Sequence, residues 1–488
     1  MKANRIAIVV AALAIAVLLV AGLLLSPSGD VEGLRVFTFS DSGVTFSGGS
    51  TNYEISGTHV TITGSGSFVL TGSCADGGVT VKKGVADVTL VLLDLDLTAT
   101  DTAPIVLGKG SQTEIQVEGI CTLTDGENPE NETSSDAAVA DAFEGAAVKL
   151  KSGAVLTLTG SGTLNVAGSA KNGIKGAAEA TLTVDGPIVH VTAAKDGISC
   201  DGGITVLGGT VNVEAENDGI KADPEDGDAA SAGRITLTGG AVTLDVGDDA
   251  IHAAGILTIG TEGAQDGPAV TVIRSHEGLE AASVYLHSGS GEIHSEDDAV
   301  NAGGSGDHEI LVTGGSWYVD SDGDGLDANG QITVTGGTLE VYGAENGAGA
   351  NTALDSDTGI AVSGGTVFTV DTNGTSPAGT RVRFTGLTVA GGAVLTVQDS
   401  EGNTLYEATA LKAADTVLLA GDGVTEGETY TLLVNGEALA QATAETGEYA
   451  DGMTGGQRPD SADGLHHQSP EGMDGQTPSP PDREPPTT

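Results

Sequence analysis

A short phrase recurs along the middle of this chain, and it constrains the fold more than any other feature. Its copies, the last of them degenerate, are KNGIKG (171–176), KDGISC (195–200), NDGIKA (217–222), DDAIHA (248–253), HEGLEA (276–281), DDAVNA (297–302), GDGLDA (323–328) and NTALDS (351–356). Successive copies are 21 to 31 residues apart. Self-similarity at such a period indicates a solenoid, in which each repeat is one coil that buries its apolar face only against its neighbours.

The segments between the phrases have the pattern of β-strands. Val, Ile, Leu and Thr alternate with other residues in runs such as 204–215 and 235–246, as half-buried strands do. A Gly-Gly pair interrupts each run, and glycine suits a repeated sharp bend because it adopts positive φ at little cost. A propeller blade would need roughly 40 residues, and a leucine-rich repeat has a Leu/Asn signature that is absent here. We therefore predict an all-β chain folded as a right-handed parallel β-helix.

Each position of the phrase should form a column, because stacked coils place equivalent residues in line. The fourth position is apolar and is expected to point inward: Ile174, Ile198, Ile220, Ile251, Leu279, Val300, Leu326 and Leu354. The small residue two places later is expected to point inward as well: Gly176, Cys200, Ala222, Ala253, Ala281, Ala302 and Ala328. The glycine at the third position, as in Gly197, is expected to supply the turn.

The second position forms an acidic column. Its residues are Asn172, Asp196, Asp218, Asp249, Glu277, Asp298, Asp324 and Thr352. One interpretation is structural, because an Asp before a turn accepts hydrogen bonds from backbone N–H groups. The other is metal binding. Carboxylates on coils about 4.8 Å apart repel by roughly 3 kcal/mol at an effective dielectric of 20, and a cation between them reverses that sign. Calcium prefers oxygen ligands, so we predict calcium as the cofactor.

Two acidic segments are the strongest calcium candidates. The loop at 217–228 carries Asp218, Asp223, Glu225, Asp226 and Asp228, and we predict a calcium cage there, with a solvated acidic loop as the alternative. The segment 320–327, with Asp324 and Asp327, begins like an EF-hand loop. However, Gln331 stands where an EF-hand has Glu, so we predict a β-turn calcium site instead. Weaker candidate pairs are Asp248 with Asp249 and Asp297 with Asp298.

The two ends of the chain differ from the coils. Lys2 and Arg5 precede twenty uncharged residues, 6–25, which are enough to span a bilayer. No convincing cleavage site follows, so we favour an uncleaved membrane anchor with its positive end inside over a cleaved signal peptide. Either way, the coils would be exported to the cell surface. The predicted organisation is an N-terminal segment (1–30), a β-helix (31–375), a small β cap (376–445) and a disordered polar tail (446–488).

Charge and cysteine content limit the partners. The net charge of −49, from 68 acidic and 19 basic residues, argues against nucleic acid, because phosphate contacts need clustered Lys and Arg. The three cysteines leave at least one thiol free. Cys200 lies in the small inward column and is expected to be buried. The spacing leaves a disulfide between Cys74 and Cys121 open.

The order of these motifs resembles the bacterial carbohydrate-binding domain family of calcium-binding parallel β-helices. The DGI-type turns lead to an EGLE-type turn at 276–280, followed by DDAVNA and GDGLDA. Segments 64–81 and 121–128 resemble the opening coils of the family, and 427–437 resembles its closing β segment. The resemblance covers about residues 36–440 and implies binding of cellulose or of acidic sugars such as polygalacturonate. The chain departs from the pattern at Asn172, Glu277 and Thr352.

Three functions remain open. The first is a non-catalytic binding module in which calcium on the acidic column bridges to uronate carboxylates. The second is a calcium-dependent polysaccharide lyase, which needs a Lys or Arg of lowered pKa as its base; the candidates are Lys195, Lys221 and Arg274. Because a carboxylate beside a lysine raises the lysine pKa, we predict binding without catalysis, with Lys195 and Lys221 as ligand contacts. The third is a surface protein that only holds calcium and adheres.

Aromatic residues and histidines add two further expectations. Only 3% of the residues are aromatic, and sugar rings commonly stack on aromatic faces. Trp317 and Tyr318, with Tyr285 and Tyr342, are the candidate platform; an inward Trp317 would disfavour cellulose. Five histidines between 252 and 308 leave a transition-metal site open, although unrelated turn and strand positions are the simpler interpretation.

Overall fold

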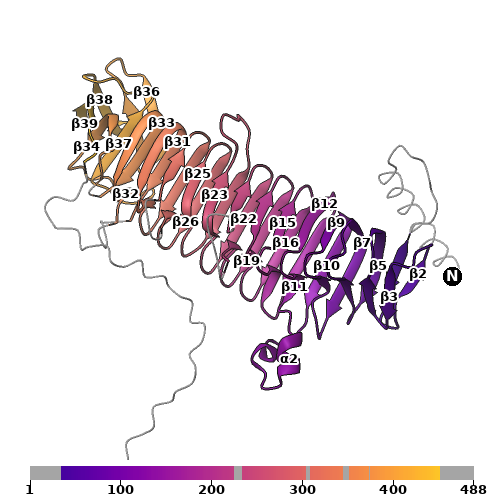
Figure 1. Ribbon diagram of the computed structural model, residues 1–488. Helices are drawn as coiled ribbons and strands as arrows, with labels where there is room; N and C mark the ends of the chain where they lie inside the picture. Colours follow the sequence, from indigo (N-terminus) through magenta and orange to yellow (C-terminus); the bar gives the residue numbers. More distant parts are fainter. Residues whose placement is uncertain (1–34, 225–232, 304–307, 345–350, 373, 451–488) are drawn as a thin grey trace, which may run out of the picture. The chain divides into compact units, whose positions relative to one another are not determined.

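The computed structural model describes residues 35–224, 233–303, 308–344, 351–372 and 374–450. In these residues the chain is almost entirely β, and most strands pair in parallel with a strand of the next coil, giving a solenoid of about 11 turns (Figure 1). The predicted all-β parallel coil is therefore confirmed. The predicted membrane segment lies outside the described residues, and so does the predicted polar tail beyond residue 450. Residues 446–450, assigned to that tail, are described and include part of a strand, Glu445–Gly447. Within the described ranges, no helix has the length and apolar character needed to cross a membrane.

Three ladders of strands build the coils. The first ladder carries the phrases: β4 (His59–Ile62), β6 (Gly78–Val81), β8 (Ile105–Leu107), β11 (Ala146–Leu150), β14 (Asn172–Gly176), β17 (Ile198–Cys200), β20 (Ile220–Ala222), β23 (Ile251–Ile259), β25 (Leu279–Leu286), β27 (Val300–Ala302), β30 (Leu326–Ala328) and β32 (Leu354–Ser356). Ile174 pairs with Ile198, Ile198 with Ile220, and so on along the stack. Equivalent phrase positions therefore lie in line, as the repeat predicts.

The other two ladders contain the alternating runs. The second comprises β5 (Gly66–Cys74), β7 (Val88–Ala99), β9 (Gln112–Glu118), β12 (Val155–Gly160), β15 (Thr181–Val184), β18 (Gly203–Val206), β21 (Ile235–Leu237), β28 (Ile310–Val312), β31 (Gln331–Tyr342) and β33 (Gly359–Asp371), and it shares the long strands β23 and β25. The third begins at β1 (Val36–Phe39), passes through parts of β5 and β7, and ends in parts of β31 and β33. Between these it comprises β10 (Ile120–Asp125), β13 (Thr163–Gly168), β16 (Ile188–Ala193), β19 (Thr210–Ala215), β22 (Ala241–Val246), β24 (Ala269–Arg274), β26 (Ser290–Ser295) and β29 (Ser316–Ser321).

Antiparallel pairs close the two ends of the stack. At the first coils, β2 (Thr45–Ser47) pairs with β1, and β3 (Tyr53–Ser56) pairs with β4. At the last coils, β33 pairs with β37 (Thr416–Gly421), which continues to β34 (Gly379–Phe384) and β40 (Glu445–Gly447). A separate four-stranded sheet follows: β36 (Thr404–Thr409), β35 (Val394–Gln398), β38 (Thr429–Val434) and β39 (Glu437–Thr443). Terminal caps of this kind protect the open edges of a stack.

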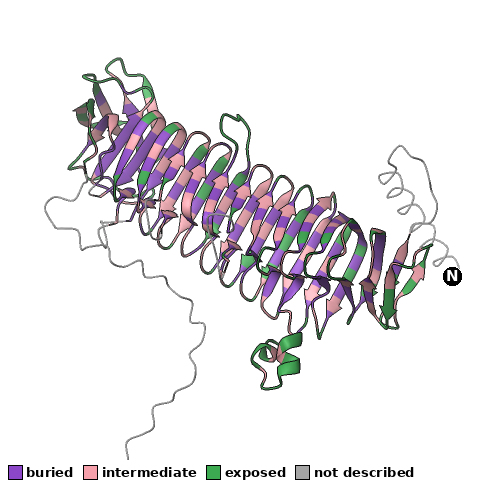
Figure 2. Cartoon of the chain, viewed as in Figure 1, coloured by how far each residue is buried: buried purple, intermediate pink, exposed green. Residues whose placement is uncertain are grey.

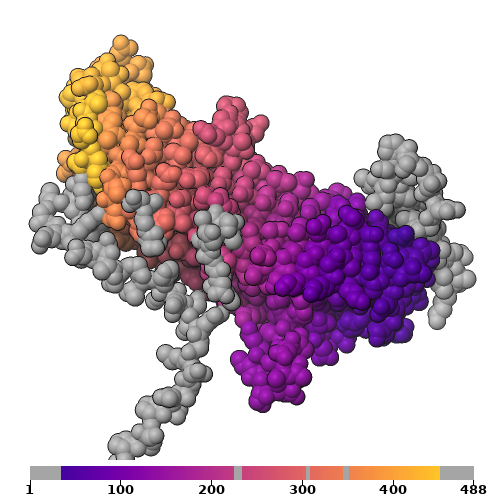
Figure 3. All heavy atoms as spheres, viewed as in Figure 1, coloured from indigo at the N-terminus to yellow at the C-terminus, as the bar shows by residue number. Residues whose placement is uncertain are grey.

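One helical insertion interrupts the coils. It follows β10 and contains the 3-10 helix η1 (Pro129–Thr133) and the short helix α2 (Ala137–Ala142). Asn128 and Asp136 cap the two elements, each accepting a hydrogen bond from a backbone N–H. The insertion stands out from the coils beside β11 (Figures 1 and 3).

The interior is the apolar core that the phrase predicts. The fourth-position column is at most 3% exposed, and the small column of Cys200 and its equivalents is buried beside it. Buried and more exposed residues alternate along the strands, as period-two patterning requires (Figure 2). All three cysteines are free and buried, so Cys74 and Cys121 form no disulfide.

Glycine serves two purposes in the coil. The second member of each Gly-Gly corner has positive φ, for example +88° at Gly209 and +79° at Gly240, as expected. The phrase glycines differ from the expectation. A Cβ on Gly197 would lie 2.2 Å from the Val213 side chain and 2.8 Å from the Gly219 carbonyl oxygen, and its φ lies outside the left-handed region. These glycines therefore allow the coils to approach closely, and they do not supply a left-handed turn.

Candidate metal centre

The acidic column lies where each coil turns into the first ladder, and its side chains join one coil to the next. Asp298 accepts a hydrogen bond through Oδ1 from the backbone N–H of Asp324 at 2.7 Å. Asp218 accepts in the same way from Asp249 at 3.3 Å, and Asp324 accepts from Thr352. The structural interpretation of the column is thus partly correct. The donor belongs to the next coil, whereas an Asx-turn would use the N–H groups of its own turn.

Among the residues that the structure describes, carboxylates of the column and nearby side chains form four groups in which metal-ligating atoms lie within 4.8 Å of one another. The groups are Asp218–Asp248–Asp249, Asp249–His252–Glu280, His276–Glu277–Asp297 and Asp298–Asp324–Asp327. Each group joins side chains of two neighbouring coils and includes at least one residue of the acidic column. Asp196, although buried, belongs to none of these groups, and Asn217 donates a hydrogen bond to it at 2.7 Å.

The group of Asp298, Asp324 and Asp327 fits calcium best. Its donors are all carboxylate oxygens, which hard divalent cations prefer. Burial, and then the charge of Asp298, raises the pKa of Asp324 to about 8. Burial also raises the pKa of Asp298 to about 6, with a further contribution from Asp297. Asp355 adds to both shifts. This concentrated negative charge is what a bound cation would neutralise.

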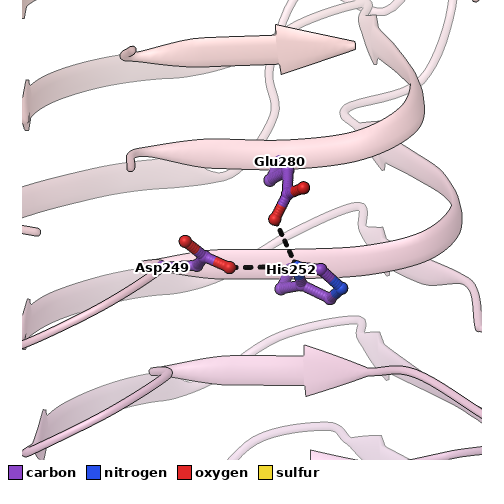
Figure 4. A group of neighbouring side chains, drawn as sticks. All are labelled: Asp249, His252 and Glu280. Atoms are coloured by element: carbon purple, nitrogen blue, oxygen red, sulfur yellow. Dashed lines mark hydrogen bonds and ion pairs between the residues drawn. The ribbon is translucent and has the colours of Figure 1, made fainter. Parts of the chain in front are cut away.

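The group of Asp249, His252 and Glu280 has a different character (Figure 4). His252 Nδ1 lies 2.9 Å from Asp249 Oδ2 and 2.5 Å from Glu280 Oε2. Burial alone would lower the pKa of His252, but its hydrogen bonds to the two carboxylates raise it well above its ordinary value. The imidazolium therefore neutralises much of the local charge. Imidazole is also a ligand for transition metals more than for calcium, so this group fits calcium less well.

The two remaining groups, Asp218–Asp248–Asp249 and His276–Glu277–Asp297, lie next to the Asp249–His252–Glu280 group. Burial raises the pKa of Asp218 to about 6, while Lys221 opposes the shift through an ion pair of 2.8 Å. Burial, with the charges of Glu280 and Asp249, raises the pKa of Glu277 to about 9. Glu277 Oε2 accepts a hydrogen bond from the Asn301 side chain at 3.2 Å. A neutral Glu277 is thus favoured at this position of the column.

The predicted cage in the 217–228 loop is largely outside the described residues. Glu225, Asp226 and Asp228 fall in the segment 225–232, and Asp223 is exposed beside it. Asp218 lies in the described part of the column, where it pairs with Lys221, accepts a hydrogen bond from the Asp249 N–H and belongs to the Asp218–Asp248–Asp249 group. The calcium site predicted there therefore stays a prediction.

The structure separates the predicted ligand contacts. Lys221 is paired with Asp218, and although burial lowers its pKa, that carboxylate raises it above the ordinary value. Lys195 is half-buried in the turn before Asp196. Arg274 contacts Asp245 at 2.9 Å with both side chains exposed, an ion pair that contributes little to stability.

The expectation that Trp317 forms a binding platform is wrong. Trp317 is 1% exposed, and its Nε1 donates a hydrogen bond to the Gly314 carbonyl at 2.8 Å. It fills the core, because it shares the inward parity of Val319 on β29. Tyr318 points the other way and is half-buried, with its ring centroid 5.6 Å from that of Tyr342. Of Trp317 and Tyr318, only Tyr318 can present a ring face to a ligand.

Grooves run over the residues that lead into the acidic turns. One, of about 440 Å³, is lined by residues including Thr192, Glu214, Asp245 and Arg274 from successive coils. A smaller one of about 210 Å³ continues with Arg274, His294 and Asp320. A third, of about 400 Å³, includes Tyr318 and Glu292. Each crosses several coils, which suits an extended ligand more than a compact one.

Some residues of the first ladder were not among the predicted calcium ligands. His252 and Glu280 occupy the fifth phrase position, three residues after the acidic column, and aligning that position across the copies would have placed them together. Asp248 and Asp297, the weaker candidates from the sequence, precede the column directly. Lys149 lies in β11, one coil before the first phrase, so no copy of the motif marks it.

Comparison with known proteins places the coils in a family. A model of the carbohydrate-binding domain-containing protein family matches residues 56–347, more than half of the chain. The chain belongs to this family. The match includes the Asp298–Asp324–Asp327 group and every other group described above.

Other comparisons add little. No curated protein sequence matches the chain. Among solved structures, the polysaccharide lyase-like protein from C. thermocellum, determined as a gadolinium derivative, is 24% identical, with a TM-score of 0.41. The alignment covers 49% of this chain and 90% of that one. At this level of similarity, the function of that protein is not carried over.

Proposed function

We propose that this protein is an exported, non-catalytic carbohydrate-binding protein that holds an acidic polysaccharide, such as polygalacturonate, with the help of bound calcium. Family membership supports the carbohydrate ligand. The N-terminal apolar segment supports export and anchoring at the cell surface. Cellulose is the less favoured ligand, because Trp317 is buried and few other rings are available for stacking.

The observation that carries the proposal is the convergence of Asp298, Asp324 and Asp327 on adjacent coils. The raised pKa values of Asp298 and Asp324 reflect half-buried carboxylates that repel one another. These three residues would hold calcium, which would supply positive charge to uronate carboxylates. The ligand would then lie along the grooves beside the turns, since those grooves cross successive coils. This explains how a chain of net charge −49 can accept an anionic polymer.

Retention on polygalacturonate should require calcium and should depend on this group. The Asp298→Asn/Asp324→Asn/Asp327→Asn variant should bind about tenfold more weakly in calcium, a loss of about 1.4 kcal/mol. The matched control is Asp101→Asn/Asp141→Asn/Asp266→Asn, which removes three exposed carboxylates and the same net charge. Affinity electrophoresis in polymer-containing gels measures both. No retention by the wild type at any calcium concentration would refute the proposed function.

A second candidate function, a calcium-dependent polysaccharide lyase, is favoured by one observation at Lys149. Burial, and after it the charges of Lys175, Lys151 and Lys171, lower the Lys149 pKa, although Glu144 opposes the shift. A lowered pKa is what a general base needs, whereas the pKa of Lys221 is shifted in the opposite direction.

We expect binding without cleavage, because Lys149 lies several coils away from the carboxylate group that would hold calcium. Absorbance of the unsaturated uronate product should therefore stay flat over hours with calcium and polygalacturonate. A calcium-dependent rise that disappears in Lys149→Gln but persists in Lys83→Gln would make the protein a lyase.

A further inference from the structure

The first ladder carries a second column, which points outward three residues after the acidic column. We name it the outward column, and it consists of Lys149, Lys175, Ser199, Lys221, His252, Glu280, Asn301, Asp327 and Asp355, each paired in register with the next. Its charge is ordered along the stack. Lysines occupy the first coils, His252 stands in the middle, and carboxylates occupy the last coils.

The basic end of the outward column is unusual for this chain. Only 19 of its residues are Lys or Arg, against 68 acidic ones, yet Lys149 and Lys175 are direct neighbours in the ladder. Like charges that face each other on adjacent strands destabilise a sheet. Two half-buried lysines in this position therefore do not stabilise the coil as a pair.

Most of the surrounding cations already have a carboxylate partner. Lys175 contacts Asp201 at 3.0 Å and donates a hydrogen bond to Ser199 at 3.0 Å. The lysines at 151 and 171 pair with Glu144 and Glu132, both contributed by the insertion that contains η1 and α2 and its C-terminal flank.

Lys149 differs from these neighbours. In the described part of the chain, Lys149 forms no ion pair and no side-chain hydrogen bond. Lys149 is half-buried between strands that carry Val106 and Lys175. The insertion stands beside β11 (Figure 1), and the charges of Glu144 and Glu127 reach Lys149 without forming an ion pair with it. A partly desolvated cation without an ion pair, next to a second lysine, is suited to an anion, because charge-assisted hydrogen bonds are strongest where water is partly excluded.

We propose that Lys149 and Lys175 form a carboxylate-binding subsite, which holds a uronate group of the polysaccharide directly and without calcium. The inference rests on the proposed function, because it assigns a second contact to the same ligand. Lys175 and Asp327 are six coils apart, or about 29 Å at about 4.8 Å per coil. One extended polymer can therefore engage both ends of the outward column, and linking the two contacts raises the overall affinity.

The test compares the full-length protein with Lys149→Gln/Lys175→Gln in a chelator, with trigalacturonate as the probe in isothermal titration calorimetry. Trigalacturonate is too short to reach the acidic end, so it reports on the lysine subsite alone. The wild type should bind it without calcium, and the variant should bind about tenfold more weakly. The control Lys82→Gln/Lys83→Gln removes two exposed lysines of the early coils and should bind like the wild type.

The outcomes separate this inference from the proposed function. Equal chelator-resistant binding by the wild type and the Lys149/Lys175 variant, or none by the wild type, overturns the subsite even if calcium-dependent retention of the polymer persists. If the wild type shows no calcium-dependent retention of the polymer, the proposed function is refuted instead. Lys149→Gln alone should melt no lower than the wild type, because it removes like-charge repulsion. Lys175→Gln also removes the ion pair with Asp201, so binding by the double variant is compared per folded molecule. A melting temperature that falls while binding per folded molecule is unchanged would show a structural role only.

Discussion

Without calcium, the protein is expected to lose stability as the pH rises from 5 to 9. Burial raises the pKa values of Asp298, Asp324 and Glu277 to about 6, 8 and 9, so the folded state holds protons that the unfolded chain releases near pH 4. Because the folded state binds more protons over this range, the free energy of unfolding falls as the pH rises. The raised pKa of His252 acts in the same direction.

Glu280, which contacts His252, opposes this trend. Burial alone would raise the pKa of Glu280, but its hydrogen bond to His252 lowers the pKa below the ordinary value. Its contribution to stability is therefore present above the unfolded pKa and is lost as the pH falls through the folded pKa. That loss lies in the acid range, so it does not cancel the decline between pH 5 and 9.

Calcium should reverse the decline, and its effect should grow with pH. Protonated carboxylates bind calcium poorly, so the shift in melting temperature should be small at pH 5 and largest at pH 9. At a calcium concentration about a thousand times the dissociation constant, the stabilisation is about 4 kcal/mol. Thermal unfolding followed by circular dichroism, in a chelator and in millimolar calcium, measures both effects.

A double variant distinguishes the role of the carboxylates in binding calcium from their hydrogen bonds to the backbone of the next coil. Asp298→Asn/Asp324→Asn keeps a side-chain oxygen that can accept from the N–H groups of Asp324 and Thr352 on the next coil. We expect it to fold, to lose most of the calcium shift, and to show a flatter dependence on pH. A calcium shift as large in this variant as in the wild type would place the metal elsewhere. Stability that rises from pH 5 to 9 would contradict the linkage argument.

The fold could be predicted in detail because its signal is repeated. Every copy of the phrase puts an apolar residue at the same position, and one inward column follows from any of them. The cap was visible only as a β segment, since its strands lack the repeat. The disulfide left open by spacing could not be judged, because Cys74 and Cys121 are placed by different strands, β5 and β10.

The candidate site was harder to predict, because its members come together across coils. Counting carboxylates along the chain favoured the 217–228 loop, where they are dense in sequence. The structure instead brings Asp298 within reach of Asp324 and Asp327, which lie one coil further along. Lys221 beside Asp218 and His252 beside Asp249 lie three residues apart within one phrase, and the sequence already suggested the first pair. The contact of His252 with Glu280 follows only once the register of the ladder is known.

The aromatic platform shows an error that the sequence itself could have prevented. On β29, Val319 is an inward residue, and side chains two apart on a strand share a face. Trp317 is therefore inward and Tyr318 outward, so the two rings cannot form one binding surface. Trp317 was chosen because other aromatic residues are scarce, although the alternation of side chains along the strand places it in the core.

Replacing Trp317 should consequently damage the fold and leave recognition intact. Trp317→Ala removes a fully buried ring and its hydrogen bond to Gly314, and it should lower the free energy of unfolding by about 3–5 kcal/mol. Tyr318→Ala, at a half-buried position that lines a groove, should change stability much less but weaken polysaccharide retention severalfold.

Chemical denaturation and polymer retention, both normalised to folded protein, distinguish the two variants. Glycine at 291 leaves room against the Trp317 ring, since a Cβ there would lie 2.5 Å from it, so the coil next to β29 is shaped around this side chain. The loss should therefore spread to the neighbouring coil, because solenoid repeats derive much of their stability from their interfaces. If Trp317→Ala keeps normal stability but loses polymer retention, the Trp317 ring contacts the ligand after all.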